Sequence, residues 1–158
     1  MNSLDELYAA YREDVYRLVY ILTGDRAVSE SVTQEVFYAS PAAGTSRVRL
    51  LADAREKALS LFRRERRGLP LHGPLPYKDA PDLDFLDTLK PLAPRGREMV
   101  VYHILYGLPY PDIAAILSIS QEAVSRECGQ ALLALDMVAR RKEEFSCGEV
   151  GRPPETGL

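Results

Sequence analysis

The chain has 158 residues, of which 46% are hydrophobic and 27% charged, and its formal net charge at pH 7 is −3. This composition excludes collagen-like, disulfide-dense and wholly disordered classes. No apolar run approaches the roughly 18–20 residues of a membrane-spanning helix, and the start MNSLDELY lacks the basic and apolar parts of a secretory signal. We therefore expect a cytoplasmic protein without membrane insertion.

Charge is distributed unevenly along the chain. Residues 1–40 contain three basic and seven acidic side chains, whereas residues 41–67 contain eight basic and three acidic ones. An acidic stretch next to a strongly basic one predicts that the two surfaces meet different partners.

Apolar residues at helical spacing predict three helices in the first 67 residues. The first begins at Leu4 and ends at Gly24, and the second stops before Pro41 because a residue that precedes proline is disfavoured in helical geometry. The inner face of the second helix contains Val28, Val32, Val36 and Phe37. The third helix is capped by Thr45 or Ser46 and carries most of its arginines on the outside.

Residues 68–82 read GLPLHGPLPYKDAPD, and their four prolines and two glycines predict a semi-rigid linker. The linker separates a first module, residues 1–67, from a second, residues 83–142. The tail, residues 143–158, is rich in glycine and proline and is expected to be disordered.

In the second module, patterning predicts helices over residues 84–90, 95–106, 111–117 and 121–141, and no strand pattern occurs in the chain. The predicted fold is therefore all-α, with two small helical modules. Residues 110–135 fit a helix-turn-helix, in which apolar residues of both helices, such as Ile113 and Val124, pack together. The outward residues of its second helix would read base edges in a major groove: Gln121, Ser125, Arg126 and Gln130. The alternative is an αα-hairpin whose polar face meets water.

Nothing in the sequence predicts an enzyme. His103 reads as a hydrogen-bonded core residue, His72 as a solvated linker residue and Cys128 as a small core residue. These residues share no spacing typical of a metal site or a catalytic relay, and no glycine-rich phosphate loop is present. We therefore expect no catalytic residue, no metal and no cofactor.

Two stretches carry a resemblance to a known family. The runs LYAAYREDVYRLVYILTGD and SESVTQEVF resemble the first conserved region of bacterial sigma-70-type factors, most closely those of the small extracytoplasmic-function (ECF) subgroup. The run LKPLAPRGREMVVYHILYGLPYPDIAAILSISQEAVSRECGQALLAL is similar to the promoter-binding domain at the C-terminus of that family. The resemblance implies a sigma factor that directs core RNA polymerase to a subset of promoters, and that is regulated in some cases by an anti-sigma factor.

The resemblance also implies where the partners bind. A clamp helix of core RNA polymerase would contact the second predicted helix, at Glu30, Gln34, Glu35 and Phe37. An acidic, amide-bearing face suits a basic partner, although the same residues fit an ordinary solvated face. Promoter DNA would contact the basic face of the third helix through its phosphates, at Arg55, Lys57, Arg63, Arg64, Arg66 and Arg67.

Several positions depart from the family pattern. Leu50 stands where the family usually has tryptophan, Lys57 and Leu61 stand near its usual asparagine and aspartate, and Glu127 replaces a usual arginine. Two alternatives therefore stay open. One is a sigma-like interaction protein that binds polymerase or an anti-sigma factor without recognising promoters alone. The other is a stand-alone helix-turn-helix regulator.

Overall fold

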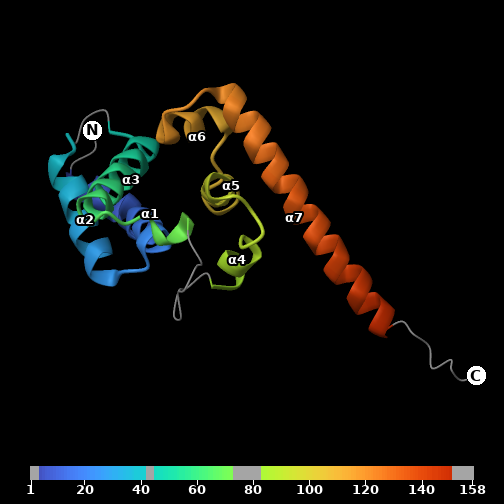
Figure 1. Ribbon diagram of the computed structural model, residues 1–158. Coiled ribbons are helices and arrows are strands. Elements are labelled where there is room, and N and C mark those ends of the chain that lie inside the picture. Colours follow the sequence, from blue (N-terminus) through green and yellow to red (C-terminus); the bar gives the residue numbers. More distant parts are fainter. Residues whose placement is uncertain (1–3, 42–44, 73–82, 151–158) are drawn as a thin grey trace, which may run out of the picture.

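The computed structural model describes residues 4–41, 45–72 and 83–150, and within these ranges every regular element is a helix (Figure 1). This confirms the predicted all-α class. The first three helices are α1 (Leu4–Thr23), α2 (Arg26–Ala39) and α3 (Arg47–Arg64), and each contacts the other two. Among the described residues, no helix combines the length and apolar character needed to cross a membrane.

Side-chain caps explain where these helices begin. The Asp25 carboxylate accepts a hydrogen bond from the Val28 N–H at the start of α2, and the Ser46 hydroxyl accepts one from the Arg49 N–H at the start of α3. Each cap satisfies a backbone donor that has no partner inside its helix. Between α1 and α2 the chain turns at Gly24, whose φ of +67° lies in the region that glycine adopts without steric cost.

The end of α3 is a Schellman turn built without glycine. The Arg66 N–H donates to the Arg63 carbonyl at 2.9 Å, and the Arg67 N–H donates to the Phe62 carbonyl at 2.8 Å. Arg66 has a φ of 56°, a left-handed conformation that is uncommon outside glycine, asparagine and aspartate. The Arg67 guanidinium lies 4.7 Å from the centre of the Phe62 ring and so closes the turn.

The remaining elements of the described ranges are a 3-10 turn, four α-helices and one π-helical turn: η1 (Pro70–His72), α4 (Leu83–Thr88), α5 (Pro94–Val100), η2 (Val101–Leu105), α6 (Tyr110–Leu117) and α7 (Gln121–Val150). One α-helix over residues 95–106 was predicted, but the structure changes to a π-helical turn at Val101. The Tyr106 N–H there donates to the Val101 carbonyl, five residues earlier, at 3.4 Å. Hydrophobic spacing does not distinguish a π-turn from a regular helix end.

Part of the predicted linker belongs to the core. Leu69 and Leu71 are buried, and η1 contacts both α1 and α5. Residues 73–82 of the predicted linker lie outside the described residues. The buried apolar residues of α1–α3, η1 and α4–α7 form one continuous cluster, so the two modules pack against each other.

The last helix is longer than predicted. Helix α7 runs from Gln121 to Val150 and extends away from the other helices (Figure 1). Residues 143–150 are therefore helical, whereas disorder was predicted from residue 143 onward; residues 151–158 lie outside the described part of the chain. The physical reason is that residues 143–147 contain neither glycine nor proline, so nothing in their backbone chemistry stops the helix.

Helices α5 and α7 approach closely at one point. A side chain added at Gly96 would place its Cβ 3.3 Å from the Cβ of Ala131, tighter than ordinary van der Waals contact. The absence of a side chain at Gly96 therefore sets how near α5 lies to α7.

Candidate partner and nucleic-acid interfaces

The candidate polymerase contacts on α2 fall into two groups. Glu30, Gln34 and Glu35 are exposed, as a partner-binding face requires. Phe37 is only 3% exposed, and its ring packs edge-on against Tyr8 with 5.0 Å between centroids. Phe37 is thus a core residue, on the same inner face as Val32 and Val36.

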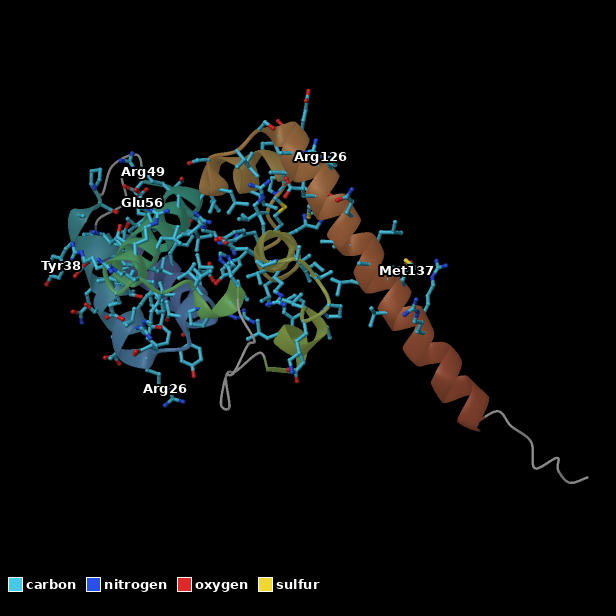
Figure 2. All side chains as sticks on the ribbon, in the orientation of Figure 1. Arg26, Tyr38, Arg49, Glu56, Arg126 and Met137 are labelled. Atoms are coloured by element: carbon cyan, nitrogen blue, oxygen red, sulfur yellow. The ribbon has the colours of Figure 1, made fainter. Side chains whose placement is uncertain are left out.

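Tyr38, which follows Phe37 in the chain, provides the exposed aromatic side chain of this surface. Tyr38 is 83% exposed and lies at the outer edge of α2 (Figure 2). Sequence reasoning missed it because the resemblance pointed to Phe37. A signal was nevertheless present, since Tyr38 lies off the apolar spacing of α2.

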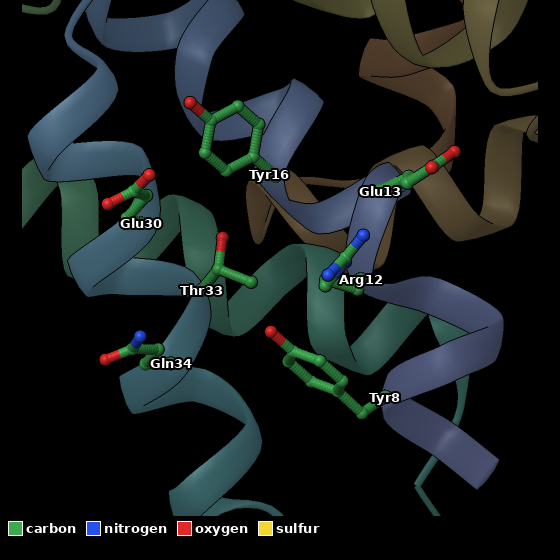
Figure 3. A pocket seen from close by; sticks show the side chains of 7 residues that line it. All are labelled: Tyr8, Arg12, Glu13, Tyr16, Glu30, Thr33 and Gln34. Atoms are coloured by element: carbon green, nitrogen blue, oxygen red, sulfur yellow. The ribbon is translucent and has the colours of Figure 1, made fainter. Parts of the chain in front are cut away.

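A groove follows the seam between α1 and α2. Its larger part has a volume of about 490 Å³ and is bordered by side chains of both helices (Figure 3): Tyr8, Arg12, Glu13, Tyr16, Glu30, Thr33 and Gln34. A second hollow of about 300 Å³ shares Tyr8 and Gln34 with the first, and its wall includes Leu4, Asp5 and Tyr38. We call the two hollows together the α1–α2 groove.

The α1–α2 groove is acidic with aromatic walls. Asp5, Glu13 and Glu30 line it together with Arg12, whose guanidinium lies 5.7 Å from the centre of the Tyr8 ring. Aromatic side chains supply large contact area, and carboxylates at the rim favour a basic partner. The groove therefore has the chemistry to accept a basic helix.

The candidate DNA contacts of α3 are also divided. Arg63, Arg64, Arg66 and Arg67 are exposed and form what we call the basic cluster at the end of α3. Within it, Arg67 pairs with Glu65. Lys57 lies further back, 3.8 Å from the carboxylate of Glu35, so one candidate DNA contact and one candidate polymerase contact meet at the surface.

Arg55 is placed differently from the other arginines of α3. Its side chain is 18% exposed, and it pairs with Glu98 of α5, whose side chain is 1% exposed. The Arg55 Nη2 donates to Glu98 Oε1 at 3.2 Å, and Nε donates to Oε2. Arg55 is therefore not part of the exposed basic face in this structure, because the second module covers that side of α3.

Glu98 is the centre of a buried polar cluster. Besides Arg55, its carboxylate contacts the His72 Nε2 at 2.9 Å and accepts a hydrogen bond from the Tyr102 hydroxyl at 2.6 Å. Burial alone would raise the pKa of Glu98, but the hydrogen bonds from His72, Arg55 and Tyr102 outweigh it and lower the pKa. Burial also raises the pKa of Tyr102.

Sequence patterns did not predict this cluster. His72 was expected to be solvated, and Glu98 entered the sequence analysis only as part of the run that resembles the promoter-binding domain of the sigma family. A glutamate placed between buried apolar residues of one helix is the signal that was available.

A second polar contact joins the two modules. The Arg47 Nε donates to Asp14 at 2.9 Å, and Arg47 Nη1 donates to the Tyr106 carbonyl at 3.0 Å. The Tyr106 hydroxyl in turn donates to the Asp14 carbonyl at 2.8 Å. Helices α1 and α3 are thereby tied to the end of η2.

Helices α6 and α7 are joined by a short turn. Ser118 has a left-handed φ of 56°, and the Ser120 hydroxyl caps α7 by accepting a hydrogen bond from the Ala123 N–H at 3.1 Å. Ile113, Val124 and Cys128 are buried between the helices, and burial raises the pKa of the Cys128 thiol. The candidate recognition residues are all exposed at the start of α7: Gln121, Ser125, Arg126 and Gln130.

The acidic residue Glu127 in this helix has a partner. Arg95 of α5 donates from Nε to Glu127 Oε1 at 2.7 Å and from Nη2 to Oε2. The hydrogen bond from Arg95 lowers the pKa of Glu127. The carboxylate that departs from the family pattern is thus neutralised from the neighbouring helix, beside the candidate recognition residues.

Comparison with known proteins is informative at the level of the fold. No protein-family model and no curated protein matches the sequence. Among solved structures, the sigma factor RpoE of Bartonella quintana, in complex with the anti-sigma factor NepR, matches with a TM-score of 0.64 and 15% identity, over 86% of this chain and 96% of that chain. A chain of the RsbN–BldN complex matches over 86% of this chain and 91% of that chain at 21% identity, but its TM-score of 0.32 is too low to compare folds. The chain therefore has the fold of a sigma factor.

Proposed function

We propose that the chain is a sigma factor of the ECF type, which binds core RNA polymerase and directs it to a subset of promoters. The observation that carries this proposal is the separation of two surfaces of opposite charge on a sigma-factor fold. The acidic α1–α2 groove lies on one face, and the basic cluster and the start of α7 supply exposed cations and amides elsewhere.

Polymerase binding is assigned to the α1–α2 groove and the adjacent face of α2. Glu30, Gln34 and Glu35 provide charge and hydrogen bonding, and Tyr38 provides an exposed aromatic anchor. Interface energy concentrates on a few aromatic and arginine residues that become fully desolvated. Tyr38 fits that role, while Phe37 supports it from below by holding α2 against α1.

DNA binding is assigned to two exposed sets of residues. The basic cluster would neutralise phosphates without reading sequence. The residues Gln121, Ser125, Arg126 and Gln130 would reach base edges, and Arg126 projects from the start of α7 (Figure 2). The Arg95–Glu127 pair supports this assignment because it removes a repulsive charge from the helix that would face DNA.

A second candidate function is that of a sigma-like protein whose main partner is an anti-sigma factor. The observation that favours it is that the similar sigma factor RpoE is held in a complex of that kind. The same α1–α2 groove would then bind a basic or amphipathic helix of the anti-sigma factor. The two functions differ in whether the chain recognises promoter DNA.

The test of polymerase binding is co-purification of tagged variants with core RNA polymerase. Gln34→Ala combined with Tyr38→Ala should reduce the affinity at least tenfold without changing thermal stability, because both side chains are exposed. Asp87→Asn, which breaks an exposed pair with Lys90 in the second module, is the matched control. Undiminished co-purification of the double variant would contradict the proposed surface.

DNA binding is tested by salt titration of the holoenzyme on promoter and random DNA. Neutralising Arg63, Arg64 and Arg67 should weaken binding to all sequences and reduce the slope of log affinity against log salt by roughly 0.9 per lost duplex phosphate contact. Gln121→Ala and Arg126→Ala should instead change which sequence is preferred, at roughly 1–3 kcal/mol each. If neither set changes DNA binding, the second candidate function is favoured.

A further inference from the structure

We infer that Glu127 is a positioning residue, which holds the Arg95 guanidinium beside the start of α7 so that its remaining N–H groups bind a phosphate of the DNA backbone. An acidic residue in the candidate recognition helix would thus strengthen DNA binding instead of weakening it. The inference rests on the proposed function and deepens it, because it adds a phosphate contact that comes from α5.

The hydrogen bonds between the two side chains fix the plane of the guanidinium. Arg95 Nε donates to Glu127 Oε1 at 2.7 Å, and Arg95 Nη2 donates to Oε2. A guanidinium is planar and carries five N–H groups, and the two bonds to Glu127 use two of them. The Nη1 edge of Arg95 therefore keeps donors that can bind a phosphate oxygen, and two parallel hydrogen bonds hold this edge in one orientation.

The guanidinium of the pair is more open to solvent than the carboxylate. The Arg95 side chain is 50% exposed, whereas that of Glu127 is 23% exposed. A second guanidinium lies on the same carboxylate, because Arg126 Nη2 is 3.9 Å from Glu127 Oε2, and the Arg126 side chain is 65% exposed. A phosphate that approaches this surface therefore meets two exposed cations and one carboxylate whose charge they offset.

The packing of α5 on α7 brings Arg95 to this surface. Arg95 lies in the first turn of α5, next to Gly96, where a Cβ would be 3.3 Å from the Cβ of Ala131. Because the helices are so close there, the Arg95 side chain reaches Glu127, one turn before Ala131. Arg126 follows directly along the helix surface and projects from the start of α7 (Figure 2). Arg95 thus lies beside the residues that we assign to DNA.

A carboxylate at this position has two opposite effects on DNA binding. Its charge repels the phosphates, which weakens binding. Its hydrogen bonds restrict the arginine to one orientation, so less side-chain freedom is lost when a phosphate binds. Because Arg95 and Arg126 offset the charge of Glu127, we expect the second effect to be the larger. Removal of Glu127 should therefore weaken DNA binding, although it removes a negative charge.

The experiment measures the affinity of the full chain for a random-sequence duplex, by fluorescence anisotropy at several salt concentrations. Arg95→Ala removes the phosphate contact and Glu127→Ala removes its support, whereas Glu127→Gln keeps one oxygen that can accept a hydrogen bond from Arg95. Glu122→Ala is the matched control, because it removes the same charge from an exposed glutamate in the first turn of the same helix. Circular dichroism of each variant verifies that the helices are kept.

We expect Arg95→Ala and Glu127→Ala each to bind the duplex at least threefold more weakly than the wild type. Arg95→Ala should also reduce the slope of log affinity against log salt by roughly 0.9, the value for one duplex phosphate contact. Glu127→Gln should bind more tightly than Glu127→Ala, and Glu122→Ala should bind at least as tightly as the wild type. When Arg95→Ala is already present, the addition of Glu127→Ala should cause no further loss.

Unchanged or tighter binding by Glu127→Ala would overturn the inference, because the carboxylate would then act through its charge alone. A loss of affinity that persists in the Arg95→Ala background would also overturn it, since Glu127 would then act without Arg95. If the wild type binds the duplex, either result leaves the proposed function standing. Absence of binding by the wild type would contradict the DNA part of the proposed function and the inference together.

Discussion

Two glutamate–arginine pairs, each with its glutamate in the second module, have the same chemistry and very different surroundings. The Glu98 side chain is 1% exposed and its Arg55 partner 18%, whereas Glu127 is 23% exposed and its Arg95 partner 50%. Both carboxylates have a lowered pKa. The buried pair connects two modules, while the exposed pair adjusts the charge of one helix surface. Burial, rather than the identity of the residues, decides which task such a pair performs.

The largest effect expected from this comparison is on stability. Glu98→Ala leaves the Arg55 charge buried without its partner, so the free energy of unfolding should fall by about 3–5 kcal/mol. Glu127→Ala should lower it by less than about 1 kcal/mol, because Arg95 can turn to water. Urea unfolding followed by circular dichroism measures both values. Equal losses in the two variants would show that burial does not distinguish the pairs.

A smaller effect concerns acid pH. Because the pKa of Glu98 is lower in the folded chain than its usual value of 4.5, the stability it contributes is fully present above that value and is lost as pH falls toward the folded pKa. Unfolding curves between pH 7 and pH 3 should show a shallower acid decline for Glu98→Gln than for the wild type. Glu127→Gln should follow the wild type more closely; a decline in Glu98→Gln as steep as in the wild type would contradict the assignment.

The smallest expected effect concerns Arg66, an exposed arginine whose backbone adopts a strained, left-handed conformation. Arg66→Gly removes the cost of a left-handed φ at a non-glycine residue and should stabilise the chain by about 1 kcal/mol. If the basic cluster binds phosphate, the same change should weaken DNA binding. Thermal unfolding and anisotropy test the two halves, with Arg63→Ala as a control that loses charge without relieving strain. A destabilised Arg66→Gly variant would show that the turn depends on the arginine side chain.

Local sequence patterns predicted the helices of the fold well, and the reason is that each helix has its own apolar face and terminal signals. Ser46 and Gly24 lie at helix ends as expected. The π-helical turn at Val101 and the extension of α7 to Val150 were not predicted, because apolar spacing does not report the hydrogen-bond pattern and a helix continues past its last packed turn where no residue stops it.

The candidate site was predicted less completely, and two residues show why. Apolar spacing placed Phe37 on the inner face of α2, and the structure agrees with the spacing rather than with the surface role that the resemblance implied. Arg55 lies beside the inner face of α3, so the apolar pattern of this helix alone predicts that it is exposed. Only the packing of the second module against α3 covers it, and long-range packing leaves no periodic trace in the sequence.

The close approach at Gly96 has a consequence for related sequences. A Cβ at position 96 would lie only 3.3 Å from the Cβ of Ala131, so a substitution at Gly96 limits which residues are tolerated at position 131, and the reverse. A relative that acquires alanine or serine at the position of Gly96 should carry glycine opposite, or else set α7 farther from α5 and lose the bond between Arg95 and Glu127. Across a family of such chains, the residues at these two positions should therefore change together, so that the distance between α5 and α7 is kept.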